Sequence, residues 1–112
     1  MKEIEWKDFE KIEIRVGKVI KVENFVKAKK PAYILHIYFG EEIGVKKSSA
    51  QIVKNYQEDN LIGKKILAVV NLPKKQIANI QSECLVTGLY DEHGGVYLCV
   101  PDGDVPLGAK LL

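Results

Sequence analysis

Lysines occur in close pairs along this chain, beside turns or at the ends of apolar stretches. The pairs are Lys27 with Lys29–Lys30, Lys46–Lys47, Lys64–Lys65 and Lys74–Lys75. Lysines neutralise phosphate groups when a fold brings them together on one surface. Lysines also serve simply as solvated surface charge, so the pairs alone leave both interpretations open.

Polar side chains that suit sugar and base-edge contacts accompany these lysines. They are Ser48, Ser49, Gln51, Asn71, Gln76, Asn79 and Ser82. Tyr33, Tyr38 and Tyr56 could offer stacking faces to bases, although packing in the core is the favoured interpretation of these tyrosines. The combination indicates a surface that could bind a nucleic acid.

The pair Lys74–Lys75 has the strongest local support, because Pro73 ends the preceding strand and fixes the direction of the loop. Asn71 would need hydrogen-bond partners if it is buried, and the loop backbone is the nearest source. We therefore expect Asn71 to shape this loop, as an alternative to touching a ligand.

The distribution of charge points to the same kind of partner. The net charge is only +2, but residues 11–80 hold 14 Lys and Arg against 6 Asp and Glu. Residues 1–10 and 81–112 are both acidic on balance. A basic middle between acidic ends suits an anionic partner, whereas solubility alone is the simpler alternative.

Residues that could perform catalysis are not combined in any recognisable way. Gly63-Lys64-Lys65 lacks the upstream glycine of a phosphate-binding loop. Cys84 and Cys99 have no second Cys or His nearby that would suggest a metal site, and His36 and His93 fit structural or solvated roles. We expect no enzyme activity, no cofactor and no metal.

Length and composition favour one folded domain over residues 1–112. Hydrophobic residues make up 46% of the chain and charged residues 29%, which suits a packed core and excludes disorder. No apolar run is long enough to enter a membrane, and the first residues carry no secretion signal. Two cysteines are too few for a disulfide scaffold, so we expect a cytoplasmic protein with free thiols.

Alternating apolar residues predict mostly strands. The expected strands cover residues 12–22, 32–39, 43–47, 64–72 and 83–90, with a return strand over 96–100. The alternation in the first strand is disturbed beside Gly17, which predicts a bulge or bend there. Residues 73–80 are expected to be a loop, and 91–95 a hairpin turn.

Two short helices complete the prediction. Trp6, Phe9 and Ile12 fall at a spacing of three before the first strand, and Ser48 or Ser49 could cap a helix running to Tyr56. Five short strands with one helix between the third and the fourth are typical of an OB-fold barrel rather than a sandwich. The expected fold class is therefore mainly β.

Several spaced segments resemble one known family. Residues 9–19 (FEKIEIRVGKV), 71–75 (NLPKK) and 82–86 (SECLV) resemble the signatures of the tRNA-binding domain found in methionyl-tRNA synthetases and in stand-alone tRNA-binding proteins. Residues 29–33, 39–40 and 43–52 resemble its CsaA branch of export-related chaperones. The family usually has Gly-Met where this chain has Cys84-Leu85, which leaves the local backbone there open.

The resemblance implies a surface that binds tRNA by its shape and backbone, and a homodimer. For the CsaA branch it also implies binding of unfolded preproteins and of the secretion ATPase. The RNA-binding positions that carry over are Lys46, Lys47, Ser48, Ser49, Gln51, Asn71, Lys74, Lys75, Ser82 and Glu83. Ser82 and Glu83 could fix the loop rather than contact RNA.

Large apolar residues near both chain ends support the expected dimer. They are Trp6, Phe9, Val105, Leu107, Leu111 and Leu112. A lone barrel leaves little core to receive them, whereas a twofold partner would cover them and double the basic surface. Capping of the barrel's open end within one chain is the alternative.

Overall fold

The computed structural model describes residues 1–112 and contains nine strands and two short helices. The elements are α1 (Trp6–Glu10), β1 (Ile14–Asn24), β2 (Tyr33–Tyr38), β3 (Val45–Ala50), α2 (Glu58–Leu61), β4 (Lys65–Val69), β5 (Lys75–Ile77), β6 (Ile80–Ser82), β7 (Leu85–Val86), β8 (Gly88–Tyr90) and β9 (Val96–Leu98). Neither helix is long and apolar enough to cross a membrane.

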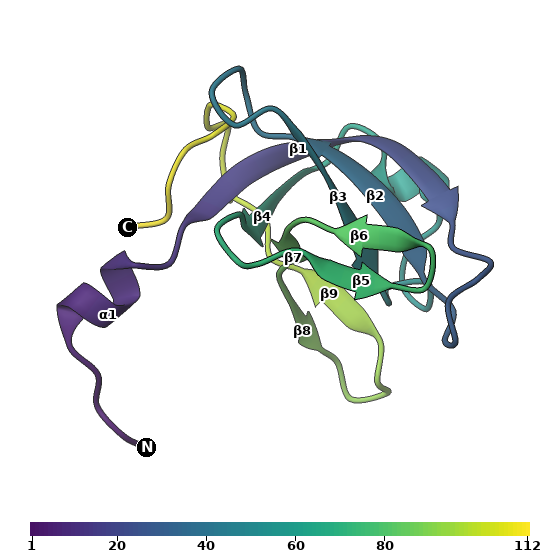
Figure 1. The fold of residues 1–112 in the computed structure, drawn as a ribbon, viewed down its shortest axis with the longest axis horizontal. Helices are drawn as coiled ribbons and strands as arrows, with labels where there is room; N and C mark the ends of the chain where they lie inside the picture. The colour runs from purple at the N-terminus through teal and green to yellow at the C-terminus, as the bar shows by residue number, and fades with distance from the viewer.

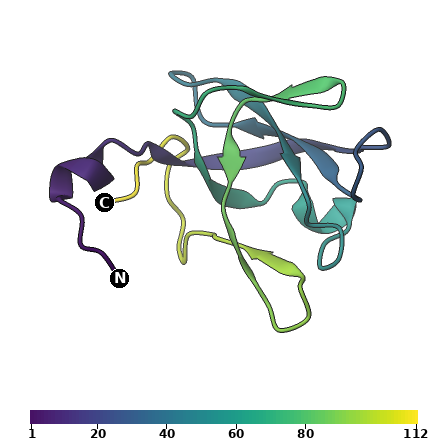
Figure 2. The same ribbon diagram turned by 60° about the horizontal axis from the view of Figure 1, so that its bottom comes forward.

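The central sheet has five antiparallel strands in the order β3-β2-β1-β4-β7 and curls into a nearly closed barrel (Figure 1). Two hairpins, β5–β6 and β8–β9, extend from the barrel on different sides (Figure 2). The prediction of a mainly β, OB-type barrel is confirmed. The predicted hairpin turn over 91–95 is also confirmed, because β8 and β9 pair on either side of it.

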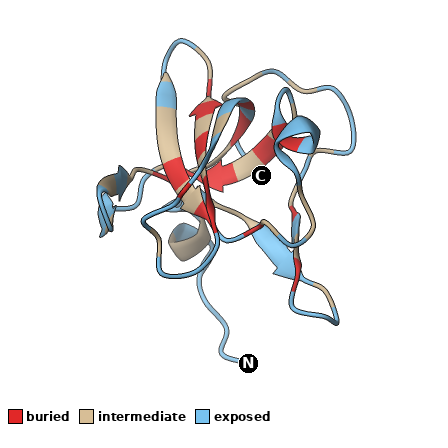
Figure 3. Ribbon diagram, turned by 90° about the vertical axis from the view of Figure 1, so that its right-hand side faces the viewer, coloured by how far each residue is buried: buried red, intermediate tan, exposed pale blue.

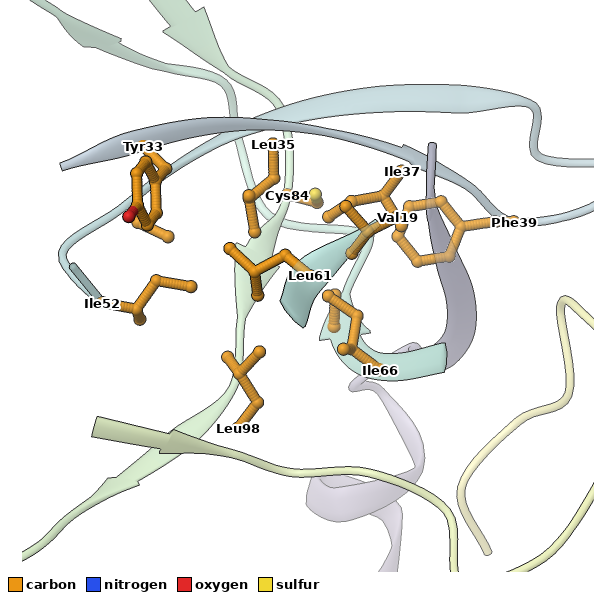
Figure 4. Close-up of a cluster of buried hydrophobic side chains, with 12 residues drawn as sticks. Val19, Tyr33, Leu35, Ile37, Phe39, Ile52, Leu61, Ile66, Cys84 and Leu98 are labelled. Carbon is orange, nitrogen blue, oxygen red and sulfur yellow. The ribbon is translucent and has the colours of Figure 1, made fainter. Parts of the chain in front are cut away.

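The core fills the barrel and follows the alternation of the strands. Tyr33, Leu35 and Ile37 of β2 are buried, whereas the residues between them are only partly covered. Val19, Ile66 and Leu98 join them from other strands (Figure 4). Buried positions therefore concentrate on the barrel strands, while the segment before β1 is largely exposed (Figure 3).

The irregularity of β1 lies at Ile20 and not at Gly17, where the sequence predicted it. The register with β2 shifts between Val19 and Lys21, so Ile20 is the extra residue of a bulge. Gly17 has another role. A Cβ there would lie 2.5 Å from Ile37 Cγ2 and 2.6 Å from Phe39 Cε1, so glycine is required for close packing.

The helix predicted from Ser48 or Ser49 to Tyr56 is wrong. β3 runs on to Ala50, because Ser49 pairs with Ile34 and Ala50 with Tyr33 in the ladder with β2. A helix between the third and fourth strands does exist, but it is α2, starting at Glu58. Leu61 at its end is fully buried and belongs to the hydrophobic core of the barrel.

Two further predicted segments differ. Residues 73–80, expected to be a loop, form strand β5 and the start of β6, joined by a tight turn in which Ala78 has a left-handed φ of 49°. The expected strand over 83–90 is split at Thr87, whose hydroxyl donates to the carbonyl of Leu67 at 2.7 Å. β7 therefore pairs with β4, and β8 leaves the barrel to pair with β9.

Candidate nucleic-acid interface

Three surface hollows meet at the end of β3, and Ser49 and Gln51 line all of them. The hairpin hollow, about 260 Å³, lies against β5 and β6 and includes Pro73, Lys75 and Ser82. The loop hollow, about 450 Å³, lies between the same hairpin and residues 27–32. We call these two together the basic groove; they also share Ile77.

The lining of the basic groove contains four lysines and no acidic residue. Lys27, Lys29 and Lys30 line the loop hollow and Lys75 the hairpin hollow. Apolar side chains and amides make up much of the remainder. Concave surfaces of one charge sign raise the local concentration of oppositely charged ligands. The groove is therefore suited to an anion with apolar parts.

The β6 side of the groove is attached to β3 through two residues predicted to bind RNA. The Glu83 carboxylate accepts the main-chain N–H of Lys47 at 3.0 Å, and Ser82 Oγ accepts that of Ser49 at 3.2 Å. The bond from Lys47 holds the pKa of Glu83 below its usual range, with help from nearby lysines. Both side chains are occupied in holding the groove together.

The neighbours Lys46 and Lys47 do not act as a pair, because successive strand residues point to opposite faces. Lys47 lies on the outer face of the sheet opposite His36, whose imidazole is 2.7 Å from the Glu23 carboxylate. Lys46 follows the face that carries the buried Ser48. The lysine pair that reads as one basic site in the sequence is thus divided between two faces.

Two of the predicted RNA-binding residues have structural roles that the sequence did not settle. Ser48 is only 1% exposed, so its hydroxyl is not available on the outer surface. Asn71 accepts the N–H of Glu13 at 2.9 Å and donates to the carbonyl of Lys11 at 2.7 Å. It therefore ties the entry of β1 to the end of β4, and does not shape the loop after Pro73.

The remaining predicted residues gather at the groove. Ser49, Gln51, Lys75 and Ser82 line it, and Lys74 stands at its rim, 60% exposed and 3.6 Å from the Glu83 carboxylate. The lysines of residues 27–30 stood out in the sequence for their charge alone. Their place in the groove could not be read from it, because it depends on how the loop folds against β5.

Helix α1, which carries Trp6 and Phe9 of the predicted dimer interface, approaches the C-terminal segment at one end of the molecule (Figure 1). Helix α1 buries none of its residues, and Trp6 is 84% exposed. Val105, Leu111 and Leu112 line an apolar hollow of about 310 Å³ together with Val16.

These residues differ in how far their own chain covers them. Phe9, Val105 and Leu107 are half-buried within the chain, whereas Leu111 and Leu112 remain exposed. Capping of the barrel within one chain therefore explains the burial of only some of the residues predicted to form the dimer interface.

A third hollow, lined by more hydrophobic than polar residues, adjoins the basic groove on its other side. The third hollow, about 360 Å³, is lined largely by hydrophobic residues of β7, β8 and β9. Nearby, Leu89 is 70% exposed, Tyr90 83% and Tyr97 58%. We call this the apolar hollow; exposed apolar surface of this kind is suited to contact with other chains.

Comparisons with family models and with curated proteins agree on one family for this chain. Residues 14–110 match the model of the family described as "Putative tRNA binding domain". Among curated relatives, the methionine–tRNA ligase of Pyrococcus horikoshii is 33% identical over 99% of this chain, and that of Porphyromonas gingivalis 29% over 97%. The chain spans only about 15% of the length of these ligases.

Solved structures with the same fold match over their full length. The CsaA chaperone protein of Picrophilus torridus has 55% identity and a TM-score of 0.91, covering 98% of this chain and 100% of that one. The chaperone CsaA of Bacillus anthracis has 43% identity and a TM-score of 0.92, with 99% and 100% covered. The MetRS related protein of Pyrococcus horikoshii has 29% identity and a TM-score of 0.87, with both chains fully covered.

Proposed function

Since this chain belongs to the tRNA-binding domain family, we propose that it binds tRNA through the basic groove and acts by binding rather than by catalysis. The observation that carries the proposal is the lining of the groove, with four lysines and no acidic residue. Lysines supply contacts to phosphates that do not depend on sequence, which suits recognition of tRNA by shape and backbone.

The predicted residues divide into two roles in this proposal. Lys47, Ser49, Gln51, Lys74 and Lys75 contact the RNA, with Lys46 adding positive charge nearby. Ser48, Asn71, Ser82 and Glu83 position the strands that carry them, as their hydrogen bonds support.

We further propose that residues 1–112 act as one cytoplasmic domain and form a homodimer through α1 and the C-terminal segment. The exposure of Trp6, Leu111 and Leu112 supports this. A twofold arrangement would place two basic grooves on one assembly, so that a single tRNA could contact both and gain avidity.

A salt titration tests the proposal for tRNA. Binding of labelled tRNA should weaken steeply as salt is raised, because each phosphate contact releases condensed counterions. Equal affinity at low and high salt, or no binding at low salt, would contradict it.

The apolar hollow and the exposed side chains beside it favour a second function, a CsaA-like chaperone that binds unfolded preproteins and the secretion ATPase. Unfolded segments expose apolar side chains that such a surface can cover. Titrating labelled tRNA and an unfolded preprotein peptide against one sample at two salt concentrations separates the functions. Salt should weaken mainly the RNA, and the variant Tyr90→Ser should weaken mainly the peptide.

A further inference from the structure

Gln51 has an unused pair of main-chain hydrogen-bonding groups at the point where the three hollows meet. Its N–H and C=O form no hydrogen bond with any other group of the protein. The residue follows the last strand position of β3 and is exposed. A donor and an acceptor on one residue can pair with a ligand that offers the complementary acceptor and donor.

The loop hollow beside Gln51 has a size and walls that suit a planar group. Its volume of about 450 Å³ lies within the range of about 300–1,000 Å³ typical of small-ligand sites. Ala28 and Ala32 line it from the loop, and Gln76, Ile77 and Ala78 line it from the hairpin. The Gln76 side chain donates to the carbonyl of Ala78 at 2.9 Å, which fixes its position.

Charge selects among the ligands that fit such a site. Lys27, Lys29 and Lys30 belong to the lining of the hollow, and no carboxylate does. A neutral peptide offers no negative charge to pair with the three lysine ammonium groups, whereas a nucleotide within an RNA chain has a phosphate on either side of its base. A paired base cannot enter, because an A-form duplex keeps its base edges within its grooves.

We propose that the loop hollow receives one unpaired base of a bound RNA, and that the main-chain N–H and C=O of Gln51 pair with the edge of this base. The phosphates on either side contact Lys27, Lys29 and Lys30. This inference rests on the proposed function and adds to it: the tRNA is held by shape and backbone, and also by one single-stranded position.

Three RNA probes and two variants test the inference. The probes are a blunt RNA stem-loop, the same stem with a short single-stranded overhang, and the overhang form with abasic sites in place of its bases. Gln51→Pro removes the free N–H without breaking a hydrogen bond of the fold, and Ala50 before it is already in a strand conformation that proline tolerates. Gln51→Ala keeps both main-chain groups and is the matched control.

The protein should bind the overhang RNA about tenfold more tightly than the blunt and abasic forms. Gln51→Pro should remove this preference. Gln51→Ala, which loses only the side-chain contact, should lower the affinity for all three RNAs alike and retain the preference. The comparison of RNA probes on the unaltered protein needs no variant, so it decides the matter even if Gln51→Pro fails to fold.

Equal binding of all three RNAs would overturn the inference and leave the proposed function intact. Absence of binding to every RNA at low salt would instead contradict the proposed function itself. If Gln51→Pro weakens binding of an unfolded preprotein peptide and not of the overhang RNA, the hollow is a peptide site and the inference is wrong.

Discussion

Lys47 and Glu83, 36 positions apart in the sequence, are joined by two hydrogen bonds. The N–H of Lys47 donates to the Glu83 carboxylate at 3.0 Å, and the N–H of Glu83 donates to the carbonyl of Lys47 at 2.7 Å. The sheet ladder does not join β3 to β7 directly, so this pair is part of what closes the barrel between them. It brings an acidic residue to the edge of a surface proposed to bind an anion.

Replacing Glu83 separates its charge from its role in positioning. Glu83→Ala removes a negative charge, which by electrostatics alone should strengthen tRNA binding. It also leaves the N–H of Lys47 without its partner and weakens the attachment of residues 82–83 to β3, where the bonds from Glu83 N–H to the Lys47 carbonyl and from Ser49 N–H to Ser82 Oγ remain. We expect tRNA affinity to fall and the free energy of unfolding to drop by about 1–3 kcal/mol, measured by fluorescence titration and urea unfolding.

Two controls make this test decisive. Glu83→Gln keeps an acceptor for Lys47 without the charge, so its affinity should equal or exceed that of the unaltered protein. Glu42 is exposed in the turn before β3, and Glu42→Ala should leave stability nearly unchanged. Tighter binding by Glu83→Ala would show that charge outweighs positioning at this residue.

Substitution of Lys74 and Lys75 by alanine should reduce the dependence of tRNA affinity on salt. Each lost phosphate contact should lower the slope of log affinity against log salt by about 1. The matched control is Lys64→Ala, since Lys64 lines none of the three hollows. A slope that falls equally for Lys64→Ala would place the contacts outside the basic groove.

Local patterns in the sequence predicted those elements whose conformation depends on residues close to one another in the chain. The apolar run over residues 32–39 correctly predicted a strand, observed as β2 over Tyr33–Tyr38. The strand predicted over 64–72 ends at Val69, so Pro73 does not end it. The helix prediction for residues 50–56 failed because the spacing of their apolar residues fits a helix as well as a strand. Pairing of Ser49 and Ala50 with β2 decided the outcome, and such pairing cannot be read from neighbouring residues.

The candidate site could be predicted in composition better than in arrangement. The resemblance predicted that Lys46 and Lys47 both bind RNA, but successive residues of a strand point to opposite faces of the sheet. Asn71 was expected to act on the loop that follows it, yet its partners, Lys11 and Glu13, lie about 60 residues earlier. Roles that depend on contacts between distant segments require the folded barrel.

Acid should weaken the attachment of the C-terminal segment. The Glu13 carboxylate is 2.8 Å from Lys110 Nζ and 2.6 Å from the Arg15 guanidinium, and Arg15 also donates to the carbonyl of Gly108 at 2.8 Å. The bonds from Lys110 and then from Arg15 hold the pKa of Glu13 below its usual range. A lowered pKa stabilises the fold above the pKa of the unfolded chain, and this stabilisation is lost as pH falls through the folded value.

The variant Glu13→Gln should therefore have a lower Tm than the unaltered protein at pH 7, and the difference should shrink towards pH 3. Thermal unfolding followed by circular dichroism across this range checks the prediction. Other carboxylates with lowered pKa, such as those of Glu23 and Asp104, are present in both proteins and cancel in the comparison. A difference in Tm that is constant with pH would contradict an ionic role for Glu13.

Thiol labelling should distinguish the two cysteines. Cys84 is 5% exposed, and burial raises the pKa of its thiol to about 12, so only about one in ten thousand of these thiols is ionised at pH 8. Mass spectrometry after brief iodoacetamide treatment should find Cys84 unmodified in the native protein and modified in urea. Rapid native labelling of Cys84 would show that the β6–β7 segment opens readily.

Trp6 provides a direct measure of the proposed dimer, because it is the only tryptophan of the chain and is 84% exposed in a single copy. If a second copy covers α1, the indole leaves water, and its emission maximum should shift to shorter wavelength as concentration rises. Light scattering on the same samples should show a mass of twice 12.6 kDa.

The double variant Leu111→Ser, Leu112→Ser should remove apolar surface from the C-terminal segment, at the same end of the molecule as Trp6. It should not alter the barrel core, because both leucines are exposed. Its emission should stay at long wavelength at every concentration, and its mass should remain that of one chain. Val26→Ser removes an exposed apolar side chain from the loop after β1 and should leave dimerisation unchanged. Emission independent of concentration together with a single-chain mass for the unaltered protein would show that α1 and the C-terminal segment do not form the interface.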